Sequence, residues 1–248
     1  MLLILPPSET KRDGGAEGTV LDLEALGFLA LGAQRQQAIA ALRQLSRSVS
    51  ESTEALGLGP TQRFEIERNR SLLTSPSLAA IERYTGVVYD ALDAQTLGED
   101  AYRFAAEHLV IGSALFGLLR SSDPIPAYRL SHNSRLGSLR LSRHWSAGVA
   151  AQLERHDGLV LDLRSEAYAA LGRAPVREDS FYIRVVTESP DGRRLALSHF
   201  NKKAKGEFVR AVLIASLVHN SAAALIDWAA ASNIRLEHGR PGELDLVV

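Results

Sequence analysis

The segment IGSALFGLLRSSDPIPAYRL, residues 111–130, is the most informative part of the chain, because an apolar run opens into a connection rich in polar side chains. Apolar residues 109–111 are typical of a buried strand, and Gly112 and Ser113 let the backbone turn closely. Two prolines then end regular structure. This connection carries Arg120, Asp123, Tyr128 and Arg129. Such a set suits a ligand site, although an Arg120–Asp123 pair that only stiffens a loop is the alternative.

Two other predicted strands end in the same way. Leu2 to Leu5 reads as a first buried strand, followed by Ser8, Glu9 and Lys11, and Leu159 to Leu163 reads as another, followed by Arg164, Ser165 and Glu166. Ligands in open α/β sheets gather beyond the carboxyl ends of parallel strands. We therefore expect the polar clusters at residues 8–11, 113–123 and 164–168 to share one edge of a sheet.

The remaining pattern predicts one α/β domain over residues 1–248. Apolar residues recur at helical spacing in residues 35–47, 77–84, 100–108, 141–154 and 220–231. Residues 181–187 and 195–200 flank the turn SPDGR and predict a hairpin, and ELDLVV adds a final strand. The expected fold is a central mixed sheet, partly parallel and flanked by helices, with a C-terminal hairpin leading into the basic start of a helix.

The segment SHFNKKAKG, residues 198–206, places three lysines before a glycine at that expected helix start. Backbone N–H groups at a helix start attract phosphate, and Lys202, Lys203 and Lys205 would strengthen the attraction around Gly206. The alternative is a solvated basic turn.

Tyrosines in YTGVVYDAL, residues 84–92, allow two interpretations. Tyr84 and Tyr89 could be core tyrosines with satisfied hydroxyls, or their rings could stack on a nucleobase.

Composition excludes several classes of protein. The chain has 248 residues, 46% of them hydrophobic, and a formal charge of −1, so a polyanion would have to be met by a local basic patch. It contains no cysteine, which excludes disulfides, thiolate metal sites and thiol redox chemistry. The first residues do not resemble a signal peptide, and no segment has the length of a membrane span, so we expect a cytoplasmic protein that does not bind membranes.

No recognised cofactor or metal motif occurs. The histidines show no zinc spacing, and the phosphate-binding loop, dinucleotide and hydrolase motifs are absent. We expect no cofactor and no bound metal, and the sequence predicts no protein partner.

Four motifs together resemble the YaaA family of bacterial proteins linked to peroxide stress. They are LILPPSETK from Leu3, YTGVVYDAL from Tyr84, SALFGLLR with its DPIPAYRL continuation, and SHFNKKAKG ending at Gly206. The resemblance implies a role in limiting damage from peroxide and unincorporated iron, and a DNA-binding role. This chain has Lys205 where the family commonly has arginine, Phe116 where tyrosine is commoner, and Ser121 in place of a frequent proline.

Two hypotheses follow. In the first, which we favour, the protein binds double-stranded DNA without sequence preference, and Arg120, Arg129 and the three lysines line a basic cleft with Ser8, Lys11, Ser113 and Tyr128 nearby. In the second, it is an enzyme acting on a nucleobase, nucleotide or nucleic acid, with Glu9, Asp123 or Glu166 as acid or base. Carboxylates repel phosphate, and their presence at the strand ends keeps the second hypothesis open.

Overall fold

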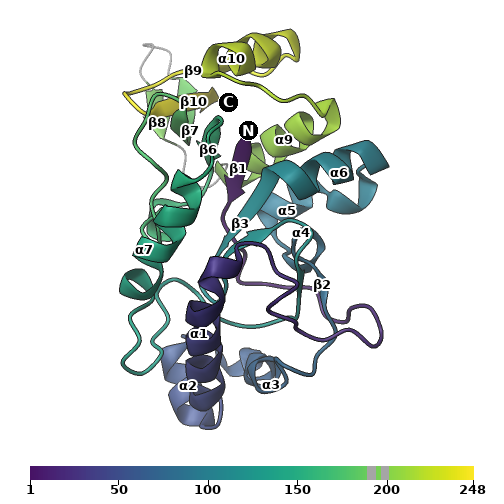
Figure 1. Ribbon diagram of the computed structural model, residues 1–248, viewed down its shortest axis with the longest axis vertical. Coiled ribbons are helices and arrows are strands. Elements are labelled where there is room, and N and C mark those ends of the chain that lie inside the picture. Colours follow the sequence, from purple (N-terminus) through teal and green to yellow (C-terminus); the bar gives the residue numbers. More distant parts are fainter. Residues whose placement is uncertain (189–193, 197–200) are drawn as a thin grey trace.

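A mixed sheet forms the centre of the computed structural model, which describes residues 1–188, 194–196 and 201–248 (Figure 1). From edge to edge the strands are β4 (Gly117–Arg120), β3 (Leu109–Ser113), β1 (Leu2–Leu5), β6 (Val160–Asp162), β7 (Ser180–Glu188), β10 (Glu243–Val247) and β9 (Leu236–His238). The five central strands are parallel to one another, and β4 and β9 pair antiparallel to their neighbours. The predicted α/β fold with a mixed, partly parallel sheet is confirmed.

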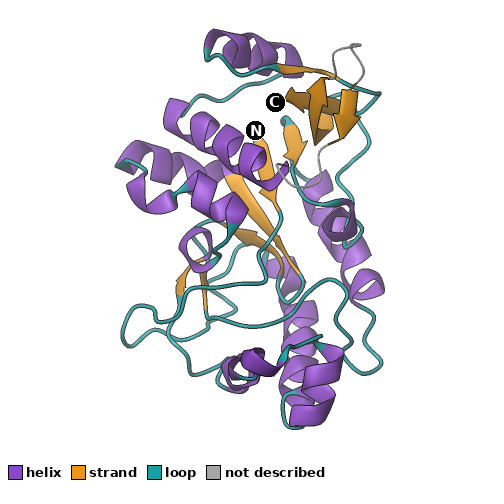
Figure 2. Cartoon of the chain, turned by 180° about the vertical axis from the view of Figure 1, so that it is seen from behind, coloured by secondary structure: helices purple, strands orange, loops and turns teal. Residues whose placement is uncertain are grey.

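Helices cover the sheet on two sides (Figures 1 and 2). On one side lie α5 (Val87–Leu92), α6 (Glu99–His108) and α9 (Asn201–Ala215), and on the other lies α7 (Leu141–Glu154). Because β1 is covered on both faces, all four of its apolar residues are buried. The predicted helices at residues 35–47, 100–108, 141–154 and 220–231 are confirmed, the first and last as α1 (Gly32–Leu45) and α10 (Ala222–Ala231).

Shorter elements complete the fold. Two helices that periodicity did not predict, α2 (Val49–Ala55) and α3 (Phe64–Arg70), pack near α1. The predicted helix at residues 77–84 is only partly right, because β2 (Leu78–Ala79) occupies its start and pairs with β5 (Pro124–Ile125) before α4 (Ala80–Arg83) begins. Single turns are η1 (Leu29–Leu31), η2 (Pro60–Gln62), η3 (Ala94–Thr96) and α8 (Glu166–Ala169).

The chain reverses sharply after β3, and this corrects one prediction. Gly117 has φ of 75°, and a Cβ on it would lie 2.8 Å from the ring of Trp145. The turn sends β4 back antiparallel to β3, with Arg120 opposite Val110. Arg120 and Asp123 therefore lie at the amino edge of the sheet, and only Ser113 of the 113–123 cluster stays at the carboxyl edge.

The C-terminal hairpin leads into α9 as predicted, but Gly206 does not mark the helix start. Strand β8 (Arg194–Ala196) pairs antiparallel with β7, whereas residues 189–193, where the turn was predicted, and residues 197–200 of the predicted second strand lie outside the described part of the chain. Helix α9 already begins at Asn201. Gly206 lies inside it against α5, where a Cβ would come within 3 Å of Ala91. Its absent side chain permits close helix packing and offers no phosphate site.

Candidate functional site

Side chains from distant parts of the sequence meet at the carboxyl edge of β1 and β3. We call this group the Lys11 cluster: it consists of Ser8, Glu9, Lys11, Tyr84, Tyr89, Ser113, Tyr128, Arg129 and Ser131. Four of these nine residues, Ser8, Glu9, Lys11 and Ser113, were predicted to share this edge. Ser131 was missed, although it lies only two residues beyond Arg129.

Lys11 is at the centre of the cluster and is only 5% exposed. Its Nζ donates to the carbonyl oxygens of Ser8 at 2.9 Å and Glu9 at 3.2 Å. The same nitrogen lies 4.1 Å from the ring centroid of Tyr128 and 5.2 Å from that of Tyr84. The ammonium predicted to attract phosphate is thus enclosed by carbonyls and aromatic rings.

Burial changes the acidity of this lysine. Desolvation lowers the pKa of Lys11 to about 7, against the opposing attraction of Glu65 and Glu9. Arg129 and Arg68 add to the lowering by charge repulsion. Near neutral pH a large fraction of Lys11 is therefore a neutral amine, the form of lysine that acts as a base or nucleophile.

A chain of hydroxyls beside Lys11 has a defined direction. The backbone N–H groups of Leu115 and Phe116 both donate to Ser113 Oγ, at 3.2 and 3.0 Å, and occupy its two lone pairs. Ser113 must then donate its own proton to the Tyr128 hydroxyl at 2.8 Å, and Tyr128 must donate to Tyr84 at 2.7 Å. Among the described residues the Tyr84 proton has no acceptor, so it is the one that the chain can offer to a ligand.

Glu9 closes the cluster on the solvent side. Its carboxylate is 55% exposed and accepts from Nη2 of the buried Arg129 at 2.8 Å and from the Ser131 hydroxyl at 3.2 Å. Arg129 is thus largely committed to Glu9 and does not line an open basic cleft.

The tyrosine rings do not present free faces. Tyr84 and Tyr89 are 2% and 5% exposed, with ring centroids 5.3 Å apart, and the Tyr89 hydroxyl donates to the carbonyl of Pro6 at 2.8 Å. Of the two interpretations, the burial matches core tyrosines, since neither ring is open to a stacked base. The Tyr89 hydroxyl has an acceptor, whereas the Tyr84 hydroxyl accepts from Tyr128 and keeps its own proton.

Two of the predicted lysines are exposed and the third is buried. Lys202 and Lys203 lie in the first turn of α9 and face solvent, with Lys203 3.3 Å from Glu207. Lys205 is 4% exposed and donates to the carbonyls of Leu163 at 3.0 Å and Arg164 at 3.5 Å. These hydrogen bonds connect α9 to the end of β6, so Lys205 does not face a ligand. Desolvation lowers the pKa of Lys205 to about 8.

Helix α9 runs parallel to α5, which places its first turn near the Lys11 cluster. Gly206 packs on Val88 and Ala91, and one turn later Arg210 donates to the carbonyls of Leu92 and Asp93. Residues 201–203 therefore lie level with the start of α5, where Tyr84 and Tyr89 join the cluster. The exposed lysines and the buried one share the carboxyl edge.

Asp123 has a structural role at the opposite edge. Its carboxylate accepts from the backbone N–H of Gly27 at 3.0 Å and of Arg120 at 2.9 Å. Burial raises its pKa, with these hydrogen bonds opposing the change. Arg120 is exposed there and packs over Gly27. Neither residue reaches the Lys11 cluster, so the prediction that they join one site is wrong.

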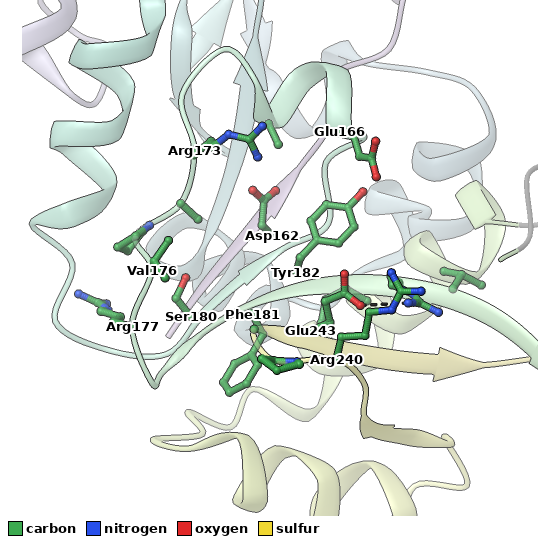
Figure 3. Close-up of a pocket in the computed structure, with 18 of the residues that line it drawn as sticks. Asp162, Glu166, Arg173, Val176, Arg177, Ser180, Phe181, Tyr182, Arg240 and Glu243 are labelled. Atoms are coloured by element: carbon green, nitrogen blue, oxygen red, sulfur yellow. Dashed lines mark hydrogen bonds and ion pairs between the residues drawn. The ribbon is translucent and has the colours of Figure 1, made fainter. Parts of the chain in front are cut away.

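Glu166 lies in a different place, at the rim of an open cavity (Figure 3). This sheet-face cavity, about 1040 Å³, lies over one face of β6, β7 and β10. Glu166, Tyr182 and Arg173 extend into it above Asp162. The register places Asp162, Tyr182 and Glu243 side by side on adjacent strands.

Arginine–carboxylate pairs satisfy most charges of this cavity. Asp162, at its base, is 3% exposed and accepts from Arg164 through both carboxylate oxygens, at 2.8 and 2.7 Å. Arg184 pairs with Glu243 at 3.0 Å, and Arg194 pairs with Asp245 at 2.9 Å. Glu166 is exposed and makes no contact with the Lys11 cluster that would support the predicted acid–base role.

Neither a cluster of metal ligands nor a membrane-spanning helix is present in the described part of the chain. Residues 1–188, 194–196 and 201–248 contain no group of three or more metal-ligating side chains. No helix among them is both long and apolar enough to cross a bilayer.

Comparison with known proteins agrees with the motifs at this edge. The family described as peroxide stress protein YaaA matches residues 1–231. The chain belongs to this family. A UPF0246 protein of Corynebacterium glutamicum strain R is 42% identical over 242 residues, covering 96% of this chain and 95% of the relative. A UPF0246 protein of Streptomyces coelicolor is 38% identical over 258 residues, covering 100% and 98%. The YaaA motifs supply most of the Lys11 cluster.

Proposed function

We propose that this YaaA-family chain protects cytoplasmic DNA during peroxide stress by binding the duplex at the carboxyl edge of its sheet. Lys202 and Lys203 contact the phosphate backbone without reading sequence, and protection against iron-linked damage takes place at the bound DNA. The observation that carries this proposal is the position of these exposed lysines beside the Lys11 cluster. A net charge of −1 means that this local contact has to supply the attraction.

The basic contact surface in this proposal is smaller than the cleft expected from the sequence. Arg120 lies at the other edge, Lys205 is buried on backbone carbonyls, and Arg129 pairs with Glu9. Two exposed lysines give a modest salt dependence, about −0.9 in log K per log salt for each phosphate contact.

A gel-shift assay with a duplex of random sequence tests this assignment. Lys202→Ala/Lys203→Ala should lose most retention at moderate salt and lower the salt slope by about 2. The matched control is Arg120→Ala/Arg155→Ala, which removes two exposed positive charges at the amino edge and should leave retention unchanged. Undiminished binding by the lysine variant, or loss of binding by the arginine variant, would refute the proposed surface.

An enzymatic function is a second candidate because Lys11, unlike the other buried lysine Lys205, lies beside the hydroxyl chain that ends at Tyr84. Its enclosed amine, with a lowered pKa and a directed tyrosine proton beside it, is the kind of arrangement found where lysine acts chemically. Of the residues predicted as acid or base, only Glu9 belongs to this cluster. The enzyme hypothesis therefore moves from the carboxylates to Lys11.

A further inference from the structure

Lysine is rare in this chain, and its positions are informative. Only four of the 28 basic residues are lysine, at positions 11, 202, 203 and 205, and all four lie at the carboxyl edge. Arginine supplies positive charge everywhere else. Arginine cannot lose its proton near neutral pH, whereas a buried lysine can, so Lys11 occupies a position where an amine offers something that a guanidinium does not.

The hydrogen bonds of Lys11 match a neutral amine. An ammonium has three N–H donors, and Lys11 Nζ has two carbonyl acceptors, those of Ser8 and Glu9, among the described residues. A neutral amine uses both of its protons on these carbonyls and keeps one lone pair. Burial favours this state by lowering the pKa of Lys11 to about 7.

Tyr84 supplies a proton donor near the neutral amine of Lys11. Lys11 and Tyr84 face each other across an isolated antiparallel bridge, and Lys11 Nζ lies 5.2 Å from the tyrosine ring centroid. Because Ser113 and Tyr128 direct their protons along the hydroxyl chain, the Tyr84 hydroxyl can donate to an oxygen placed beside the amine. A nucleophile and a proton donor therefore belong to the same cluster of side chains.

We propose that the Lys11 amine forms a covalent imine with the aldehyde of a damaged deoxyribose in DNA. The nitrogen attacks the aldehyde carbon, the carbon–oxygen double bond opens, and the oxygen takes a proton from Tyr84. One nitrogen proton then returns to the Tyr84 oxygen and the other passes to the former aldehyde oxygen, which leaves as water when the carbon–nitrogen double bond forms, so amine and aldehyde give imine and water. Once protonated, the imine keeps one N–H for the carbonyl of Ser8 or Glu9.

The choice of substrate rests on the proposed DNA function. Oxidation of deoxyribose and loss of a base both leave an aldehyde on the sugar, and peroxide stress produces such lesions. An aldehyde is also the carbonyl that reacts most readily with a neutral amine. Lys202 and Lys203 would hold the flanking phosphates while the opened sugar reaches Lys11 past the exposed carboxylate of Glu9.

Reductive trapping tests the proposal directly. The full chain is incubated with sodium cyanoborohydride and a duplex that contains one abasic deoxyribose, and the adduct is located by peptide mass spectrometry. A tetrahydrofuran analogue of the abasic site, which has no aldehyde, is the substrate control. We expect one adduct on Lys11, none with the analogue, and a rate that falls about tenfold per pH unit well below pH 7, as the neutral amine is lost.

Variants separate amine chemistry from charge. Lys11→Arg keeps a positive charge, and Lys11→Met keeps an unbranched side chain only one atom shorter; both should abolish the adduct while retaining duplex in a gel shift. Arg155→Lys places a new exposed lysine at the amino edge and should gain no adduct there. If thermal unfolding shows that neither Lys11 variant folds, the position of the adduct in the unaltered chain decides between support and refutation of the imine proposal.

The outcomes separate this proposal from the DNA proposal. Duplex retention without an adduct, or an adduct confined to Lys202, Lys203 or Lys205, overturns the imine proposal and leaves DNA binding standing. If the duplex is not retained at all, the DNA proposal fails, and trapping with 2-deoxyribose 5-phosphate decides the amine chemistry alone. Labelling of Lys11 by that sugar supports it, and absence of labelling refutes it.

Discussion

The Lys11 cluster and the sheet-face cavity use charge in opposite ways. The cavity is large and open, yet its carboxylates on the sheet face are paired with arginines: Asp162 with Arg164, and Glu243 with Arg184. The Lys11 cluster is compact, and its central amine donates to neutral carbonyl oxygens and lies over aromatic rings, while the carboxylates of Glu65 and Glu9 attract it without a direct ion pair. The comparison indicates that the size of a cavity is a poor guide to chemistry here, and that a buried ionisable group without a direct ion pair is a better one.

The largest expected effect is on stability, from breaking a pair at the base of the cavity. Asp162→Ala leaves the Arg164 guanidinium buried without its carboxylate and should cost about 3–5 kcal/mol of unfolding free energy. Urea denaturation measures the loss. The matched control is Glu166→Ala, which removes an exposed carboxylate from the same cavity and should change stability by less than about 0.5 kcal/mol.

The same two variants could contradict the contrast between the sheet-face cavity and the Lys11 cluster. If Asp162→Ala keeps its stability but loses duplex retention, the cavity has a functional charge and the contrast with the Lys11 cluster does not hold.

A smaller effect should come from interrupting the hydroxyl chain of the Lys11 cluster. Tyr128→Phe leaves the hydroxyls of Ser113 and Tyr84 without their shared partner in a buried setting, at a cost of about 1–3 kcal/mol. Tyr102→Phe is the matched control, because Glu82 at 3.2 Å is the one partner of its hydroxyl among the described residues and Tyr102 is partly exposed. Equal losses of unfolding free energy for the two variants, measured by thermal unfolding, would show that the buried hydroxyl chain stabilises the protein no more than a partly exposed hydrogen bond does.

The sequence predicted the fold where hydrophobic patterns were long and regular. Strand β1, helix α7 and strand β10 follow directly from apolar runs or helical spacing, and their bounds agree closely with the predicted ones. The short helices α2 and α3 were missed because segments of seven residues carry little periodic signal.

The site was predicted in part because strand ends in a parallel sheet share an edge. Ser8, Glu9, Lys11 and Ser113 came together for that reason, and Tyr84, Tyr128 and Arg129 were identified through the family motifs. Arg120 and Asp123 were misplaced because the direction of β4 depends on a tight turn at Gly117, packed against Trp145 from a distant helix. The burial of Lys11 depends on Tyr128, 117 residues away, and no local pattern encodes it.

The titration of the lysines tests the central claim most directly. Protein labelled with ¹³C at lysine Cε should give only four such signals, because the chain has four lysines, and their shifts can be followed from pH 5 to pH 11. The account predicts that one signal, absent from Lys11→Met, titrates with a pKa of about 7, and that the Lys205 signal titrates with a pKa of about 8. If the signal lost in Lys11→Met titrates near 10.4, the ordinary lysine value, Lys11 is no neutral amine at physiological pH and the account is contradicted.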